Sequence, residues 1–313
     1  MRRREFALAA IGAGALGGQP PEPRTFIYKK AAGCDIKADV FTPPSDGRRP
    51  AAVYIHGGAL IMGSRHLSHK TRVLRALLDA GFRVISIDYR LAPETKLPGI
   101  IEDVRDAFAW VRRRNSELEI DADRLAVCGG SAGGYLTLMT GFCVNPRPKA
   151  LVAFWGYGDI TGAWYSRPDP FYLKQPHVSK QEALGSVTAS ALAEPPPGNN
   201  RRLFYLYCRQ QGLWPQQVGG HDPFKENRWF DPYSPIRNVD SRYPPTMLVH
   251  GTADTDVPYE QSKMMAERFA KAGVEHRFVT VPDGAHGIGN IPPEQQDRIY
   301  RDAAAFLHKR VAS

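Results

Sequence analysis

Cysteine is scarce in this sequence, and its spacing argues against a metal or redox centre. Four cysteines occur among 313 residues, and no two of them form a C-x-x-C motif. We therefore expect neither a thioredoxin-like site nor a cysteine-based zinc site. A disulfide between Cys34 and Cys208 would need an exported location, and nothing in the two positions predicts it.

Motifs for cofactors and membranes are missing as well. The sequence contains no H-E-x-x-H motif, no phosphate-binding P-loop and no strand-to-helix dinucleotide fingerprint. It has no internal repeat and no apolar run long enough to cross a bilayer. We therefore expect no cofactor, no metal ion and no stable membrane span in the mature chain.

Basic residues exceed acidic residues, but no nucleic-acid motif accompanies them. Lys and Arg number 41 against 32 Asp and Glu, which gives a formal net charge of +9. The densest internal cluster, Arg112 to Arg114, closes a helical pattern over residues 100–115, where cations offset the helix dipole. Because no aromatic side chains are interleaved with this cluster, we expect no nucleic-acid partner.

The first 23 residues differ from the rest of the chain. Three arginines at positions 2–4 precede Phe6, and a small, apolar stretch over residues 7–18 leads to the proline-rich residues 19–23. This pattern resembles a twin-arginine export signal, although it has no clean A-x-A cleavage site; the alternative is a frayed basic arm. A signal would place the mature protein in the periplasm or outside the cell, and without one the protein would be cytoplasmic.

Residues 24–313 predict a single α/β domain. A hydrophobic content of 42% and a charged content of 23% are typical of a globular protein. Near-continuous apolar strands alternate with helical stretches, which indicates a mostly parallel sheet covered by helices on both faces. The expected strands are 51–55, 84–87, 125–128, 151–154, 247–250 and 278–281, and the expected helices are 70–80, 100–115, 135–142, 259–272 and 293–311. Sheets of this kind bind ligands beyond the carboxyl ends of their strands.

One serine stands at a sharp turn from strand to helix. Ser131 is the centre of the pentapeptide Gly-Gly-Ser-Ala-Gly at residues 129–133, between the apolar run 124–128 and the helical stretch that includes Tyr135. In a G-x-S-x-G pattern the glycines let strand and helix pass close together, while the serine sits in a strained turn. The pentapeptide by itself is equally consistent with a glycine-rich turn.

Three further segments favour a nucleophilic serine. The expected strand 51–55 ends in His-Gly-Gly-Ala at 56–59, where glycines allow backbone N–H groups to face a substrate oxygen. Another expected strand ends just before Asp254, and a third is followed by a loop that carries His286. The chain order serine, aspartate, histidine is that of α/β hydrolases and differs from the two common serine-protease orders.

On these residues the chain resembles the α/β-hydrolase superfamily and, within it, the hormone-sensitive-lipase-like carboxylesterases. The matching motifs are residues 56–59, 88–94, 129–133, 250–254 and 284–287, which span nearly all of the mature chain. Ala59 stands where the lipase-like motif usually has a third glycine, and the N-terminal cap helices common in that family are not expected here. The chain is equally similar to acetyl and feruloyl esterases and to kynurenine-formamidase-like amidases.

The resemblance implies a role for each of the reactive residues. Ser131 would be the nucleophile, His286 the general base and Asp254 the carboxylate that orients the imidazole. The resemblance places the oxyanion-binding backbone at Gly57, Gly58, Ala59 and Ala132. Asp256 is a rival for the carboxylate role, and we favour Asp254 because it directly follows Gly-Thr-Ala, as in the family.

Between residues 156 and 240 the strand–helix alternation stops and aromatic residues are frequent. Because this segment lies between two expected core strands, we expect a cap inserted over the active site. Most of its aromatic side chains are expected to pack the cap onto the sheet, and about a third to contact substrate. His177 and His221 also fall in this segment and are lesser candidates for substrate contact.

The sequence thus predicts a serine carboxylesterase for short- to medium-chain acyl esters. Its partner would be a small-molecule ester or an ester linked to a polysaccharide. Two alternatives remain open at this point: an amidase or peptidase, which must protonate a poorer leaving group, and a non-catalytic binding module. The intact serine, aspartate and histidine argue against the binding module.

Overall fold

The computed structural model describes residues 22–44, 47–68 and 70–312. The predicted export signal therefore lies almost wholly outside the described residues, as does His69. Within the described ranges, no helix is long and apolar enough to cross a membrane.

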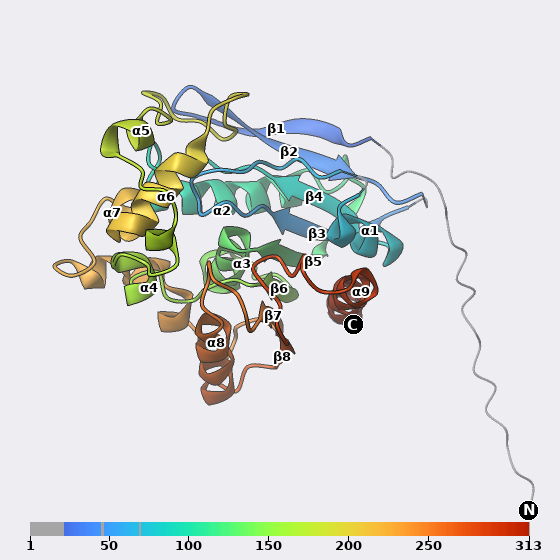
Figure 1. The fold of residues 1–313 in the computed structure, drawn as a ribbon. Helices are drawn as coiled ribbons and strands as arrows, with labels where there is room; N and C mark the ends of the chain where they lie inside the picture. The colour runs from blue at the N-terminus through green and yellow to red at the C-terminus, as the bar shows by residue number, and fades with distance from the viewer. Residues whose placement is uncertain (1–21, 45–46, 69, 313) are drawn as a thin grey trace, which may run out of the picture.

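An eight-stranded, mostly parallel sheet forms the centre of the molecule, as the sequence predicts (Figure 1). The strand order is β1-β2-β4-β3-β5-β6-β7-β8. β1 and β2 are antiparallel to each other and β2 is antiparallel to β4, whereas all pairs from β4 to β8 are parallel. The strands are β1 (Arg24–Ala31), β2 (Cys34–Phe41), β3 (Arg49–Ile55), β4 (Arg83–Ile87), β5 (Ile120–Gly130), β6 (Ala150–Phe154), β7 (Thr246–Gly251) and β8 (His276–Val281).

The six parallel strands are those expected from the sequence, whereas β1 and β2 were not. β1 forms the sheet edge, and half-exposed and exposed side chains such as Lys29 and Lys30 interrupt its apolar pattern. A register shift between Ile27 and Lys29 also breaks its period. An edge strand of this kind lacks the continuous apolar run that marks a strand buried on both faces.

Helices cover both faces of the sheet and produce two apolar cores. α1 and α9 pack side by side on one face, and α2, α3 and α8 cover the other (Figure 1). Successive residues of β3 alternate between the two cores: Val53 and Ile55 lie in one, and Ala52 lies in the other. The helices outside the inserted segment are α1 (Arg72–Asp79), α2 (Leu97–Arg113), α3 (Ala132–Cys143), α8 (Glu260–Lys271) and α9 (Pro293–Val311).

The segment over residues 156–240, here called the inserted segment, contributes no strand to the sheet. Its α-helices gather at one side of the molecule (Figure 1). Its elements are α4 (Ala163–Ser166), η1 (Tyr172–Lys174), α5 (Lys180–Leu184), α6 (Arg201–Gln211), α7 (Trp214–Gly219), η2 (Asn227–Tyr233) and η3 (Pro235–Arg237).

A buried ion pair ties the inserted segment to the loops that follow β3 and β4. Arg201 of α6 is 2% exposed, and its guanidinium lies 2.8 Å from a carboxylate oxygen of Glu94. The same guanidinium donates to the backbone carbonyls of Ile61 and Ala92. Ile61 belongs to the loop after β3, so this one side chain joins three parts of the chain.

Loss of the Arg201 side chain is expected to destabilise the fold strongly. Arg201→Ala leaves the buried Glu94 carboxylate without its cation, which costs about 3–5 kcal/mol of unfolding free energy. Arg202→Ala changes the exposed neighbour and should stay within about 0.5 kcal/mol of wild type. Urea unfolding of both variants measures the difference, and equal midpoints for the two would contradict this role of Arg201.

Candidate active site

Ser131 occupies a strained turn between a strand and a helix. β5 ends at Gly130 and α3 begins at Ala132, so Ser131 stands between them with φ 57° and ψ −122°. Non-glycine residues adopt such backbone angles only where the surrounding structure enforces them. Here the Ser131 N–H donates to the carbonyl of Phe154 at the end of β6, at 2.9 Å. The turn therefore presents the serine at the carboxyl edge of the sheet.

The glycines beside Ser131 are required by close backbone packing. A Cβ atom on Gly133 would lie 2.0 Å from the carbonyl oxygen of Ile55 in β3. A Cβ atom on Gly129 would lie 2.5 Å from the carbonyls of both Ile55 and Gly133. Strand and helix thus pass one another at a distance that only glycine permits, as the G-x-S-x-G pattern predicts.

Asp254 and His286 follow β7 and β8, and the structure brings them together. His286 Nδ1 lies 2.8 Å from Asp254 Oδ2, within a hydrogen bond. β5, β7 and β8 are parallel, so Ser131, Asp254 and His286 all emerge at the same edge of the sheet. The three predicted residues therefore share one end of the domain although they are spread over 156 positions of the chain.

The Asp254 carboxylate is buried, and both of its oxygens accept hydrogen bonds. Oδ1 accepts hydrogen bonds from the backbone N–H groups of Asp256 and Val257, each at 2.9 Å. Oδ2 lies 3.3 Å from Nε2 of the buried His250 in addition to its bond with His286. Burial raises the pKa of Asp254, but the bonds from His250 and His286 outweigh it and hold the pKa well below its usual range. Asp254 is therefore ionised at neutral pH.

The second ring nitrogen of His286 faces another carboxylate. Nε2 lies 3.4 Å from Asp256 Oδ2, and no hydrogen bond joins the Ser131 hydroxyl to His286, both of which are described residues. Catalytic hydrogen bonds are often long before substrate binds. Burial lowers the pKa of His286, but the hydrogen bond that His286 donates to Asp254 and the charges of Asp256 and Asp254 outweigh it, so the pKa is raised above 6.5.

The raised pKa of His286 sets the expected pH dependence. A base must be neutral, so kcat/KM should be full above this pKa and fall as pH drops through a midpoint above 6.5. Asp256→Asn removes a negative charge 3.4 Å from Nε2 and should move the midpoint to lower pH. Asp283→Asn removes an exposed charge from the loop after β8, which carries His286, and should leave the midpoint in place. Rate profiles from pH 4 to 9 measure this, and a flat profile down to pH 4 would contradict a histidine base.

The predicted oxyanion-binding backbone lies directly against the serine. A Cβ atom on Gly57 would lie 3.3 Å from the Cβ of Ser131. The N–H groups of Gly58, Ala59 and Ala132 have no acceptor among the described residues. Ala59 has φ 56°, in the left-handed region that favours glycine, which is the residue usual at this position in the lipase-like motif. The structure thus brings free backbone donors and the serine together.

His56 contacts this loop through its imidazole ring. The buried ring stacks on Tyr89 with centroids 4.2 Å apart, and Nδ1 lies 2.7 Å from the Gly57 carbonyl. Burial lowers the pKa of His56 to about 4, so the ring is neutral at pH 7. His56 therefore shapes the loop and is no rival to His286 as the base.

Residues of the inserted segment reach the same edge of the sheet. The indole N–H of Trp214 in α7 donates to the Ala59 carbonyl at 2.9 Å. Asp256 accepts hydrogen bonds on Oδ1 from the hydroxyls of Tyr172 and Tyr205 and from the guanidinium of Arg209. His177 and His221 make none of these contacts; His221 stacks on Trp229 instead, with centroids 4.1 Å apart.

Sequence reasoning missed several residues around the site. Residue 250 was noted only as part of the motif 250–254, and His250 is a buried partner of Asp254. Trp155 was not singled out, yet its ring lies edge-on to His286 with centroids 6.2 Å apart. The available sequence signal for the contact between His250 and Asp254 was that the two residues lie four positions apart in the chain. Nothing in the sequence pairs Trp155 with His286.

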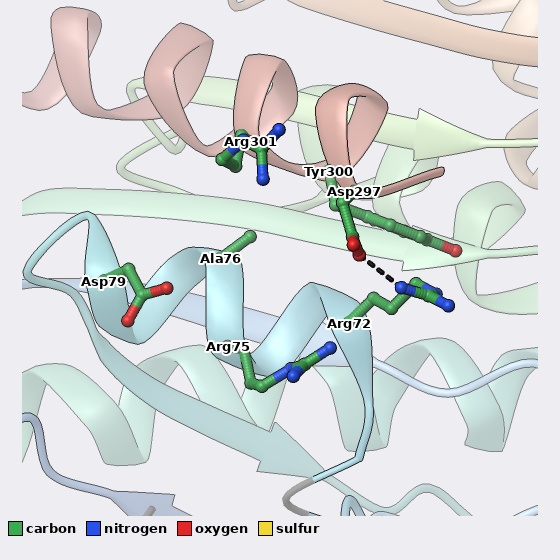
Figure 2. A pocket seen from close by; sticks show the side chains of 7 residues that line it. All are labelled: Arg72, Arg75, Ala76, Asp79, Asp297, Tyr300 and Arg301. Carbon is green, nitrogen blue, oxygen red and sulfur yellow. Dashed lines mark hydrogen bonds and ion pairs between the residues drawn. The ribbon is translucent and has the colours of Figure 1, made fainter. Parts of the chain in front are cut away.

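A separate cavity of about 180 Å³ lies between α1 and α9 (Figure 2). Arg72, Arg75 and Arg301 line it together with two aspartates, and Arg72 pairs with Asp297 across it. None of the predicted site residues lines this cavity. Among the described residues, no cluster of histidine, cysteine and carboxylate side chains could hold a metal ion, and the four cysteines are free thiols.

Several known proteins are similar to this chain in fold or sequence. A solved carbohydrate esterase from gut microbiota superposes with a TM-score of 0.69 at 22% identity, covering 94% of this chain and 98% of that one. A thermophilic esterase of Thermogutta terrifontis with bound butyrate gives a TM-score of 0.65 at 23% identity, over 92% and 94% of the two chains. At these identities the likeness shows the fold.

Among curated proteins, the non-reducing polyketide synthase adrD of Penicillium rubens is 28% identical over 340 aligned positions. The alignment covers 92% of this chain but 14% of the synthase, so the chain spans about one seventh of that relative. A family model of the α/β-hydrolase fold matches residues 52–290, which include the serine turn, Asp254 and His286. The chain therefore belongs to the α/β-hydrolase family, in its hormone-sensitive-lipase-like branch.

Proposed function

We propose that this protein is a serine carboxylesterase that hydrolyses short- to medium-chain acyl esters through an acyl-enzyme intermediate. The observation that carries the proposal is the hydrogen bond of 2.8 Å between Asp254 and His286, placed at the sheet edge where the strained turn presents Ser131. A carboxylate, an imidazole and a hydroxyl in this order along an α/β-hydrolase chain are the parts that acyl transfer requires.

In the first step, Ser131 attacks the ester carbonyl and His286 takes the serine proton. Asp254 holds Nδ1, so Nε2 is left to accept the proton once it approaches the hydroxyl to within about 2.6–3.2 Å. The charged imidazole is stabilised by the Asp254 carboxylate. The N–H groups of Gly58, Ala59 and Ala132 supply donors for the oxyanion, with Gly57 shaping the loop.

In the second step, the tetrahedral intermediate collapses and the alcohol leaves with the proton from Nε2. Water then attacks the acyl-enzyme, again with His286 as the base, and releases the acid and free Ser131. The inserted segment acts as the cap over this chemistry, because Trp214 contacts the oxyanion loop and Arg209 contacts Asp256 beside His286. The cap therefore bounds the space left for the acyl and alcohol groups.

The class of reaction is tested with three chromogenic substrates. We expect turnover of p-nitrophenyl acetate, slower turnover of p-nitrophenyl octanoate and little turnover of p-nitroacetanilide, because the anilide has the poorer leaving group. Faster hydrolysis of the anilide than of both esters would favour an amidase. Absence of turnover of all three would leave the non-catalytic module as the better account.

We also propose that the chain is exported, on the basis of the arginine-rich and apolar residues before position 24. Fractionation of a host cell that expresses the full-length chain tests this proposal. The expected result is a shortened protein in the periplasm or medium. Full-length protein found solely in the cytosol would contradict it.

A further inference from the structure

Asp256 has one carboxylate oxygen that is fully occupied and one that is free. Oδ1 accepts from the hydroxyl of Tyr172 at 2.7 Å, from the hydroxyl of Tyr205 and from Arg209 Nη1 at 3.0 Å. Oδ2 accepts no hydrogen bond from any described residue, and it lies 3.4 Å from His286 Nε2. The free oxygen therefore lies beside the reacting atoms, with its acceptor capacity unused.

The surrounding groups fix which of the two oxygens is free. Arg209 is 1% exposed, and it also donates to the Asp256 backbone carbonyl at 2.9 Å and to Asp169 at 2.6 Å. The Arg209 guanidinium lies 4.5 Å above the Tyr172 ring, so the donors are packed against one another. Rotation of the carboxylate would break three hydrogen bonds, and the orientation of Oδ2 toward His286 is therefore held.

This oxygen lies on the alcohol side of a bound ester. His286 Nε2 delivers its proton to the leaving oxygen, which must come within about 2.6–3.2 Å of that nitrogen. Since Oδ2 is 3.4 Å from the same nitrogen, the leaving oxygen and Oδ2 are at most about 6.6 Å apart. A hydroxyl on the carbon next to the esterified carbon can bridge this distance with one hydrogen bond.

We propose that Asp256 Oδ2 binds a hydroxyl group on the alcohol part of the substrate, which selects esters of polyhydroxylated alcohols over esters of simple alkanols. This inference rests on the proposed esterase function and names its substrate class. Asp256 is then a specificity-determining residue, and Tyr172, Tyr205 and Arg209 are the residues that position it. A carboxylate that served only to anchor the inserted segment would have no effect on alcohol preference.

The substitution Asp256→Asn replaces the hydrogen-bond acceptor at the Oδ2 position with a donor. Two tyrosine hydroxyls and a guanidinium donate to Oδ1, so the amide oxygen of an asparagine takes that place and its NH₂ group takes the place of Oδ2. The variant thus keeps the size and the anchoring contacts of the wild type. It presents a donor where the wild type presents an acceptor.

The test compares two acetate esters of equal size, 2-hydroxyethyl acetate and propyl acetate. Their kcat/KM ratio is measured for the wild type and for Asp256→Asn, whose folding is checked by thermal unfolding. A hydrogen bond to a charged group changes such a ratio about tenfold or more. We expect the wild type to prefer the hydroxyethyl ester. In the variant the amide NH₂ can still donate to the hydroxyl oxygen, but this hydrogen bond is uncharged and weaker, so we expect the ratio to fall about fivefold. An effect of the variant on His286 would lower kcat/KM for both esters by the same factor. Such an effect therefore leaves the ratio of the two values unchanged.

A third ester tests the inference on the wild-type protein alone, without any substitution. 2-Methoxyethyl acetate keeps the second oxygen but has no donor, so the wild type should prefer 2-hydroxyethyl acetate over it about tenfold as well. A wild-type ratio near one for both pairs, or a ratio that is unchanged in Asp256→Asn, overturns the inference and leaves the esterase function standing. No Ser131-dependent hydrolysis of any of the three would overturn the esterase function and this inference with it.

Discussion

Ser131→Ala is expected to lower kcat for p-nitrophenyl acetate by at least about 10⁴-fold, because no other group can form the acyl-enzyme. The substitution removes one oxygen atom and leaves the strained turn, the glycine contacts and the bond from Ser131 N to the Phe154 carbonyl in place. Folding should therefore be unaffected. Initial rates and thermal unfolding of the same preparation separate the two effects.

A matched control for this variant is Ser190→Ala, which changes an exposed serine of the inserted segment. Its rate should equal that of the wild type. If Ser131→Ala retained more than about one hundredth of the wild-type rate, the nucleophile would have to be a different residue, and the site built around the serine turn would be wrong.

The second large effect is expected from Asp254→Asn, with a loss of about 10⁴-fold in kcat. The amide cannot stabilise the charged imidazole, and its NH₂ group favours the wrong tautomer of His286. Asp254 is also the carboxylate that accepts from His286 Nδ1, at 2.8 Å. Asp256, two residues further along the chain, makes a different contact, because its carboxylate faces Nε2 of His286.

Asp256→Asn therefore separates the two carboxylates. We expect it to lower kcat on p-nitrophenyl acetate by less than about 10²-fold, since the orientation of His286 by Asp254 is retained. Rates for both variants, measured at the pH of maximal activity of each, give the comparison. Equal losses, or a larger loss for Asp256→Asn, would assign the orienting role to Asp256.

Local patterns were sufficient to predict the core of the fold and to single out three residues that the structure brings to one edge of the sheet. Five of the six parallel strands are largely buried, whereas β8 is an edge strand with exposed residues, and each strand appears in the sequence as a short apolar run. Each of the three predicted residues lies in the turn or loop that follows such a run. The pentapeptide around Ser131 contains its own structural reason, because glycine is needed wherever strand and helix touch. β1 and β2 carry no comparable signal, because Lys29 and Lys30 in β1 and Asp35, Lys37 and Asp39 in β2 interrupt their apolar runs.

The surroundings of the site could not be predicted in the same way. Arg209 lies 47 positions from Asp256 in the chain and in a segment without regular alternation, yet the two form a partly buried ion pair. The sequence shows that such an arginine exists but does not show which carboxylate it meets. The same holds for Trp214 and the Ala59 carbonyl, whose contact depends on how the inserted segment folds back.

Labelling with a fluorophosphonate, followed by mass mapping of the modified peptide, tests the central claim most directly. The reagent reacts with a serine that an adjacent base activates. The account predicts one label per chain, on Ser131, with none in Ser131→Ala and a greatly reduced rate in Asp254→Asn. A label on another residue, or equal labelling of wild type and Ser131→Ala, would contradict it.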